Sequence, residues 1–319
     1  MVRSASQLAS RISAHDISES CAKVVGAHSA LTNMRPLVHR LLPATLGVLI
    51  ASILYTTLNW WGFLVLFPWV GLSVSTGIFL RQVLHGRKKL IGRKVCLLMI
   101  LPCLLFFVPI VNNENFQLEG VFLIVLVGFL SKGFIHYLVA KLLGPFIWRR
   151  GFCGYACWTA AVLDWLPIRA QSSNVPRSYR RLRYVALALS MALPAYLILA
   201  LSYNPYTNYI NRQEMAWMFA SNGIYYAIGV PLAFLLRDRR AFCKYACPVS
   251  VVMIPSASVG LLKIHPDREV ICLSCGSCNR HCPMGVDVMT CMQQNVAVTD
   301  PECILCNDCK IVCPVSKFA

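Results

Sequence analysis

The chain has 319 residues, of which 57% are hydrophobic and 13% charged, and its formal net charge is +17. This hydrophobic fraction, with a mean hydropathy of +0.59, excludes an ordinary soluble protein of this length. A nucleic-acid-binding protein would carry its basic residues beside exposed aromatic residues on a soluble domain, and we identify no such domain in the sequence.

The hydrophobic residues fall in stretches long enough to cross a membrane. They are preceded by residues 1–36, which are polar and contain no apolar signal-peptide core, so we expect a cytoplasmic tail there. Residues 37–258 form the expected all-α membrane domain, and residues 259–319 form a separate small domain. About six spans are expected, at roughly 41–58, 62–80, 95–111, 118–140, 184–203 and 217–236. A fused or re-entrant first pair would reduce this number to five.

The basic residues gather in the segments that would lie on one side of the membrane. Of the 30 Lys and Arg residues, 28 lie in 1–40, in 81–94, in 141–183 or from 237 onward. By the positive-inside rule, this predicts a multi-pass protein of the inner (cytoplasmic) membrane, in contact with lipid and with both termini in the cytoplasm. The segments of the opposite side contain Arg212 and the acidic residues Glu114, Glu119 and Glu214.

Ionisable residues inside a membrane helix are costly, and they are therefore functional candidates. In the fourth stretch, Lys132 and His136 are four residues apart on one helix face, and Tyr137 follows. A quinone headgroup needs a hydrogen-bond donor and a proton acceptor, which these side chains could supply. The alternative is a lysine that extends to the membrane surface and a histidine bonded to a neighbouring helix. These three residues are a candidate quinone site.

A short motif occurs twice, at Arg149–Cys157 and at Arg239–Cys247. Each copy contains a Cys-x3-Cys pair whose two side chains share a helix face. Duplicated helix hairpins in membrane proteins often pack about a pseudo-twofold axis, with functional sites at the repeat interface. The four thiols could ligate a third metal centre such as an iron–sulfur cluster, form a redox-active dithiol pair, or be small packing residues. The cysteines are Cys153, Cys157, Cys243 and Cys247.

The C-terminal segment contains the pattern Cys-x2-Cys-x2-Cys-x3-Cys-Pro twice. In bacterial two-cluster ferredoxins, three cysteines of such a run bind one [4Fe-4S] cluster and the fourth binds the other. A structural zinc site is the alternative, but zinc sites pair two Cys-x2-Cys units rather than two such runs. The pattern therefore predicts an iron–sulfur electron carrier. Cluster 1 is expected on Cys272, Cys275, Cys278 and Cys313, and cluster 2 on Cys303, Cys306, Cys309 and Cys282.

Over roughly residues 40–319, this combination of features resembles a family of polytopic membrane ferredoxins. The family includes the quinol-dehydrogenase subunit of periplasmic nitrate reductase, the membrane iron–sulfur protein of nitrous-oxide reduction and the accessory protein of cbb-type haem–copper oxidases. Residues Cys243–Pro248 match the family's Cys-x3-Cys-Pro motif, whereas Trp158 follows the first pair in place of proline. Residues Cys282–Asp287 are similar to a Cys-Pro-x-Gly-Ile-Asp stretch of the oxidase accessory proteins.

The resemblance implies an all-α polytopic membrane domain followed by an α+β module with two [4Fe-4S] clusters. Neither the flavin domain of the nitrous-oxide protein nor the immunoglobulin-like domain of the oxidase protein fits in this sequence, so the compact nitrate-reductase type is closest in outline. The implied function is electron relay between the quinone pool and a redox partner protein. A copper reductase or assembly factor that uses the Cys-x3-Cys thiols is an alternative, and a passive membrane anchor for a catalytic subunit is another.

Overall fold

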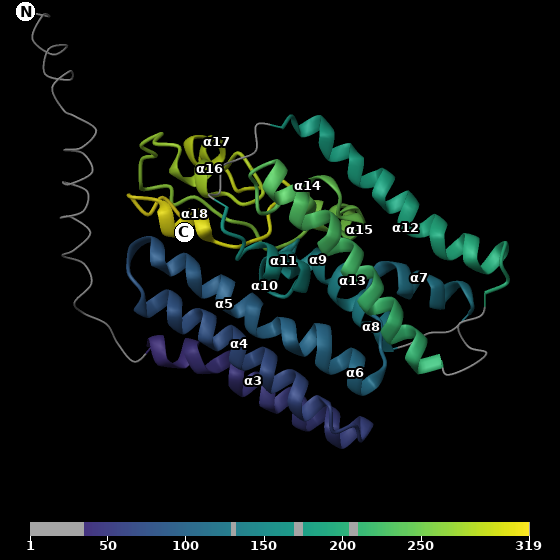
Figure 1. Ribbon diagram of the computed structural model, residues 1–319. Helices are drawn as coiled ribbons and strands as arrows, with labels where there is room; N and C mark the ends of the chain where they lie inside the picture. The colour runs from purple at the N-terminus through teal and green to yellow at the C-terminus, as the bar shows by residue number, and fades with distance from the viewer. Residues whose placement is uncertain (1–34, 129–131, 169–174, 204–209, 319) are drawn as a thin grey trace, which may run out of the picture.

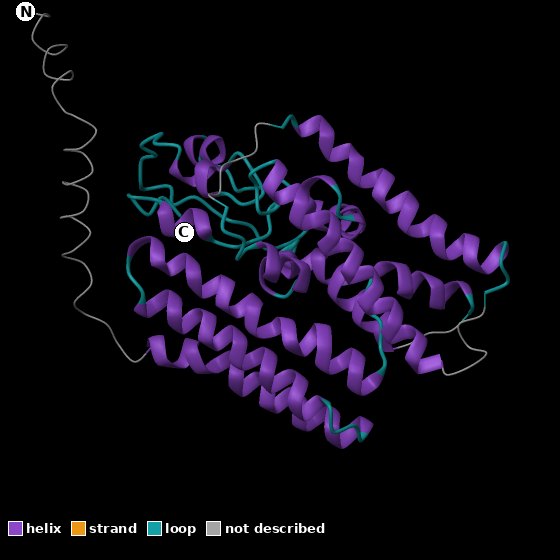
Figure 2. Ribbon diagram, viewed as in Figure 1, coloured by secondary structure: helices purple, strands orange, loops and turns teal. Residues whose placement is uncertain are grey.

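The computed structural model describes residues 35–128, 132–168, 175–203 and 210–318, and nearly all of its regular structure is helical (Figures 1 and 2). The expected tail, residues 1–36, lies almost wholly outside the described part of the chain. Long helices run alongside one another, and the C-terminal segment covers one end of them (Figure 1). We call the described residues from 259 onward the C-terminal module, and the helix ends that it covers the module end.

Five helices among the described residues are long and apolar enough to cross a membrane, which supports a membrane protein. Many of their large apolar side chains, such as Leu49 and Leu189, are exposed, as lipid-facing side chains would be. The spans are Arg40–Leu58, Phe63–Val83, Gly86–Asn112, Arg177–Leu199 and Gln213–Leu235.

These spans are built from helices that differ in their regularity. The third contains a π-helical turn beginning at Pro102, which has no backbone N–H to donate to the preceding turn. The elements are α3 (Arg35–Leu58), α4 (Phe63–Val83), η1 (Gly86–Lys89), α5 (Leu90–Leu101), η2 (Pro102–Phe107), α6 (Val108–Asn112), η4 (Arg177–Arg181), α12 (Leu182–Leu199) and α13 (Ile210–Leu235).

Five of the about six predicted spans are long continuous helices among the described residues, whereas the fourth stretch is broken into shorter helices. Gly128 has φ +84°, a left-handed conformation that ends a helix readily when the residue is glycine. The first two spans are not fused, since Asn59 turns the chain between them with φ +51°. The pieces of the fourth stretch and its continuation are α7 (Leu118–Leu126), α8 (Lys132–Tyr137), η3 (Leu138–Leu143) and α9 (Gly144–Trp148).

The first three spans pack closely through glycine. A Cβ atom on Gly71 would overlap the backbone carbonyl of Pro43, and one on Gly92 would overlap that of Gly77. Small residues let membrane helices approach at backbone distance, which is the usual way they associate without a hydrophobic driving force. These spans therefore form one layer, α3–α4–α5, which lies apart from α12 in Figure 1.

Short helices lie at the module end, between the long spans and the C-terminal module. The expected β component of that module is reduced to two isolated antiparallel bridges, Ile264–Val298 and Pro266–Phe318, and the described residues contain no strand. Most of the module is instead loop, with short helices (Figure 2). The helices between the spans and the module are α10 (Gly151–Tyr155), α11 (Trp158–Leu163), α14 (Ala241–Tyr245) and α15 (Pro248–Ser258), and those of the module itself are α16 (Ser277–His281), α17 (Val288–Gln293) and α18 (Asp308–Val312).

Candidate functional site

The C-terminal module contains a cavity lined by four cysteines from both runs. Cys272, Cys275 and Cys278 come from the first run, and Cys313 is the last cysteine of the second. This is the grouping that crossed ligation requires for cluster 1. Four thiols around one cavity fit the donor set of a [4Fe-4S] cluster, and ligation itself stays a prediction.

The other four cysteines form a second group. Cys282, from the first run, lies within electrostatic range of Cys303, Cys306 and Cys309 in the second run. This again is the crossed grouping, here for cluster 2. Among the residues that the structure describes, no three His, Cys, Asp or Glu side chains are close enough to bind a single metal ion.

The two runs repeat the same local backbone. Each fourth cysteine accepts a hydrogen bond from an amide four residues later, at 3.4 Å from Val286 N to Cys282 Sγ and from Lys317 N to Cys313 Sγ. An amide directed at sulfur stabilises a thiolate, which is the form that binds iron. The paired turn residues with positive φ are Ser274 and Leu305, Gly276 and Asn307, and Gly285 and Ser316.

The two Cys-x3-Cys motifs also share one backbone conformation. Ala156 has φ −126° and ψ −9°, and Ala246 has φ −126° and ψ −13°. In each copy one phenylalanine carbonyl accepts bonds from the next alanine and cysteine amides, at 2.9 to 3.0 Å. Trp158, which replaces the proline of the second copy, begins α11 just as Pro248 begins α15. The departure from the motif therefore leaves the local fold unchanged.

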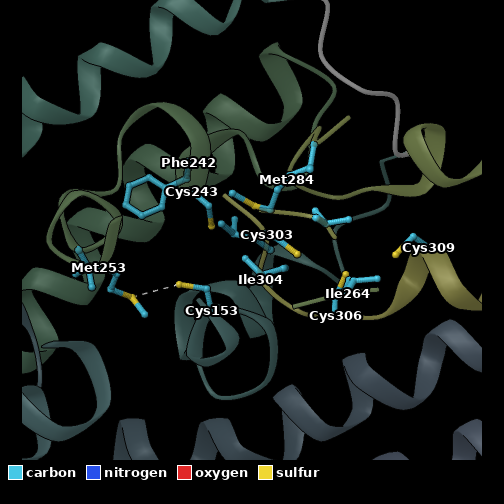
Figure 3. Close-up of a cluster of buried hydrophobic side chains, with 14 of the residues drawn as sticks. Cys153, Phe242, Cys243, Met253, Ile264, Met284, Cys303, Ile304, Cys306 and Cys309 are labelled. Atoms are coloured by element: carbon cyan, nitrogen blue, oxygen red, sulfur yellow. Dashed lines mark hydrogen bonds between the residues drawn. The ribbon is translucent and has the colours of Figure 1, made fainter. Parts of the chain in front are cut away.

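The structure brings the four cysteines of these motifs together at the module end. Cys247 lies within electrostatic range of Cys153, Cys157 and Cys243. Cys153 Sγ is also 3.7 Å from the thioether sulfur of Met253 (Figure 3). The motifs thus form one buried sulfur-rich site, which we call the four-thiol site.

Buried cations surround the four-thiol site. Arg150 and Arg240, the equivalent arginines of the two copies, are each about 1% exposed or less, and both interact electrostatically with its cysteines. Lys141 on η3 is equally buried and interacts with Cys157 and Cys247. Arg150 and Arg240 are paired with carboxylates, but Lys141 forms no ion pair within the described residues. The site therefore favours a negatively charged occupant, because an uncompensated buried charge is costly.

Lys141 was not identified from the sequence. Its ammonium donates to the carbonyl of Phe116 at 2.6 Å and lies 4.5 Å from the ring centre of Tyr137 and 4.8 Å from that of Trp158. Such a position over aromatic faces stabilises a desolvated cation. The spacing of Tyr137 and Lys141, four residues apart in an apolar stretch, was the available signal.

Two carboxylates form ion pairs with the buried arginines of this region. Asp164 accepts hydrogen bonds from Arg93 at 2.8 Å and from Arg240 at 2.6 Å. Burial alone would raise the pKa of Asp164, but the two guanidinium groups outweigh burial and hold that pKa well below its usual range. In the C-terminal module, Glu302 pairs with Arg150 and with Arg183.

The first Cys-x3-Cys motif lies directly against the loop that carries the cluster 2 cysteines. A Cβ atom on Gly154 would overlap the backbone carbonyl of Ile304. The Tyr155 hydroxyl donates to the carbonyl of Cys306 at 3.2 Å. Figure 3 shows Cys153 and Cys243 on one side of this contact and Cys303 on the other.

The predicted quinone residues are only partly positioned by the structure. The side chain of Lys132 lies outside the described part of the chain. His136 Nε2 and Tyr137 Oη are buried and make no hydrogen bond within the described residues. The His136 ring lies 4.4 Å from the ring of Phe116, centre to centre.

Glu119 joins this polar region, although the sequence placed it in a segment of the opposite side. It lies in the first turn of α7 and is 6% exposed. Its Oε1 accepts hydrogen bonds from Ser190 and Tyr225, both at 2.8 Å, and its Oε2 has no partner among the described residues. Glu119 also lies within electrostatic range of Tyr137. We call Glu119, His136 and Tyr137 the buried polar site.

Three curated proteins are similar to parts of this chain. A putative electron transport protein, YccM of Escherichia coli, is 25% identical over 195 residues, which cover 56% of this chain and 53% of that protein. The methylamine utilization ferredoxin-type protein MauN of Methylobacillus flagellatus is 27% identical over 139 residues, covering 42% of this chain and 48% of MauN. Protein NirI of Paracoccus denitrificans is 28% identical over 201 residues, covering 56% of this chain and 28% of NirI.

The chain thus spans about half the length of the first two of these relatives. No family model matches the sequence. No solved structure matches it either.

Proposed function

We propose that this chain is a membrane-bound electron-transfer protein that relays electrons one at a time between the quinone pool and a protein partner. The names of two of its relatives, an electron transport protein and a ferredoxin-type protein, support an electron-transfer role. The finer assignment, to a quinol-dehydrogenase subunit resembling that of periplasmic nitrate reductase, rests on the two cysteine patterns.

The observation that carries this proposal is the position of the four-thiol site between two other candidate sites. On one side, Tyr137 of the buried polar site lies within electrostatic range of Cys153 and Cys247. On the other side, Gly154 lies against Ile304, between Cys303 and Cys306. Electron transfer requires redox groups that lie close to one another. In this arrangement the four-thiol site would connect the buried polar site with the cysteines expected to bind cluster 2.

The buried polar site has the groups that quinol oxidation requires. A quinol that loses two electrons also releases two protons, so its hydroxyl groups need acceptors. Glu119 Oε2 and His136 Nε2 are buried, have no hydrogen-bond partner within the described residues and could accept these protons, and Tyr137 Oη could donate to the carbonyl that forms. The [4Fe-4S] clusters would supply one-electron redox chemistry.

The quinol relay is tested by anaerobic reduction with a quinol analogue in nanodiscs. We expect quinol to bleach the visible absorbance of the C-terminal clusters in the wild type. Serine at all four positions of the four-thiol site should block this bleaching while dithionite still bleaches both clusters. Each single substitution should have nearly the same effect as the quadruple one, because ligands of one centre act as a unit. Normal bleaching in the quadruple variant would falsify the relay through these thiols.

We also propose the inner membrane and a cytoplasmic location for the module end and both termini. The support is the accumulation of Lys and Arg in the segments at this end. Reporter fusions after Lys94, Arg183 and Ala319 should report cytoplasm, and a fusion at Asn113 should report the opposite side. A C-terminal reporter that is active only outside the cytoplasm would contradict this orientation.

A copper reductase is the second candidate, and one contact favours it. The thioether of Met253 beside the Cys153 thiol forms a pair of soft sulfur ligands, which Cu(I) prefers. Two thiols would give two electrons to two Cu(II) ions, forming one disulfide and two Cu(I) ions with release of two protons. Met253→Leu should then abolish Cu(I) retention and leave quinol-driven bleaching intact. If the wild type does not oxidise its thiols with Cu(II) under anaerobic conditions, this candidate is excluded.

A further inference from the structure

A hollow at the module end is lined by basic residues from three segments that are distant in sequence. Arg87 and Lys94 lie around the start of α5, Arg239 precedes the second Cys-x3-Cys motif, and Arg280 lies on α16. Cys282, which we expect to bind cluster 2, lines the same hollow. The hollow therefore opens beside the predicted position of that cluster.

The carboxylates in this hollow are already bound to other basic residues. Within the described residues, none of the four basic residues named above forms an ion pair. Lys94 donates to the backbone carbonyl of Asp164 at 3.0 Å, and Arg239 donates to that of Leu166 at 2.9 Å, and these neutral acceptors do not cancel a charge. The hollow thus has an uncompensated positive charge. The occupied acidic residues are Asp164 with Arg93 and Arg240, Asp238 with Lys244, and Asp308 with Arg81 and Arg93.

We propose that this basic hollow is the docking site of a protein electron carrier with an acidic face. Carboxylates of the carrier would enter the hollow and bring its redox centre beside Cys282. One electron would then pass between cluster 2 and the carrier, oxidising one and reducing the other, with no proton or bond transferred. The inference rests on the proposed electron-transfer function and adds the place and charge of the partner.

The lining of the hollow favours a protein over the other anions. It contains no aromatic side chain other than His281, so a nucleotide base would find little surface on which to stack. Leu90, Ile91 and Pro283 add apolar area among the cations. Protein interfaces combine an apolar core with arginine in this way. Arg280 belongs to the C-terminal module rather than to a membrane helix, which favours a partner approaching from the aqueous side over a lipid headgroup.

The test measures electron transfer from protein that dithionite has already reduced, so the quinol step is bypassed. In a stopped-flow instrument, the reduced protein in nanodiscs is mixed with a high-potential acidic carrier or with basic cytochrome c, and an acidic plant-type [2Fe-2S] ferredoxin is added in a competition experiment. Each reaction is followed at several ionic strengths. We expect faster transfer to a high-potential acidic carrier, such as acidic azurin or plastocyanin, than to cytochrome c at equal driving force, and the acidic carrier's rate should fall as salt is added. The [2Fe-2S] ferredoxin serves as an acidic competitor that should slow this reaction.

Charge-reversal variants identify the docking surface. Arg87→Glu and Arg280→Glu should each lower the rate to the acidic carrier by about tenfold or more at low salt and flatten its salt dependence. Arg268→Glu, which changes an exposed basic residue of the C-terminal module outside the hollow, should leave the rate unchanged. Because Arg87 lies far in sequence from the cluster cysteines, its variant separates docking from cluster assembly, which the visible absorbance checks.

Four results would overturn the proposal. Equal rates in Arg87→Glu and Arg268→Glu would show that the hollow does not dock the carrier. An effect of Arg87→Glu that appears in anionic nanodiscs and vanishes in neutral ones would assign the hollow to lipid headgroups. If the reduced wild type transfers electrons to neither carrier, the proposed function fails together with the docking site, whereas rapid transfer without salt dependence removes the docking site alone.

Discussion

Asp164 and Arg240 form a two-point ion pair beneath the C-terminal module, with Nε–Oδ1 at 2.7 Å and Nη2–Oδ2 at 2.6 Å. Both side chains are almost completely buried. The pair links Asp164, at the end of α11, to Arg240 in the second copy of the motif. It therefore connects the helix that follows the first copy with the second copy.

Asp164→Asn should destabilise the protein by about 3–5 kcal/mol, because it leaves Arg93 and Arg240 buried with no carboxylate. Glu269→Gln, at an exposed position of the C-terminal module, is the matched control and should change stability by less than about 0.5 kcal/mol. Thermal unfolding of the detergent-solubilised protein measures both. Equal unfolding temperatures for the two variants would contradict the assigned role of the ion pair.

The same pair predicts a pH dependence. Burial would raise the pKa of Asp164, but its arginine partners hold that pKa below the ordinary value of 3.8. A depressed pKa means that the stabilisation is complete above pH 3.8 and is lost as the pH falls through the lower, folded-state value. The stability difference between wild type and Asp164→Asn should therefore be constant from pH 5 to pH 8 and should shrink only below pH 3.8.

Gly154→Ala should loosen the C-terminal module from the membrane domain, because the added Cβ atom would overlap the Ile304 carbonyl. Overpacking of this kind costs about 1–3 kcal/mol. Gly151→Ala, in the same short helix, meets its nearest neighbour, Trp148, at an ordinary 3.4 Å and is the control. Limited proteolysis between the two parts should be faster in the first variant only.

Cys313→Ala should damage the cluster expected on Cys272, Cys275 and Cys278, because Cys313 lines their cavity. The purified wild type should contain about eight iron atoms in the C-terminal module, four for each run. EPR spectra of the reduced protein distinguish the two clusters. Cys291→Ala, which changes a cysteine outside both groups, should leave the iron content unchanged. Loss of the Cys303 cluster in place of the Cys272 cluster would refute crossed ligation.

If the four-thiol site holds an iron–sulfur centre as its third metal centre, Lys141→Met should lower the reduction potential of that centre, because the reduced centre is more negative and loses a neighbouring buried cation. Lys141→Arg keeps the charge and should lie closer to the wild type. An EPR-monitored redox titration measures the potential in each variant. Equal potentials in the methionine and wild-type proteins would mean that Lys141 stabilises only the fold.

The sequence predicted the local parts of the candidate site and missed the long-range ones. The crossed ligation by Cys282 and Cys313 was predicted from the two-cluster ferredoxin pattern; Cys313 lines the cavity of the first run's cysteines, and ligation itself stays a prediction. Glu119 was expected in a segment of the opposite side, because a charged residue at the edge of an apolar stretch is typical of a loop. It lies instead in the first turn of α7. The break near Gly128 was missed because one glycine in an apolar segment is compatible with a continuous helix. The pairing of Arg150 with Glu302 joins residues so distant in sequence that no local pattern reveals it.

The ion pair between Arg150 and Glu302 has a consequence for how the protein folds during its synthesis. The ribosome adds Glu302 and Asp308 long after Arg150 and Arg81, the arginines that they neutralise. Until then the guanidinium groups of Arg150 and Arg81 remain hydrated, because burying them without a carboxylate is costly. The four-thiol site should consequently stay accessible to assembly factors during synthesis and close only when the C-terminal module folds over it. A nonsense codon after Pro301 would leave it open and expose the truncated protein to degradation.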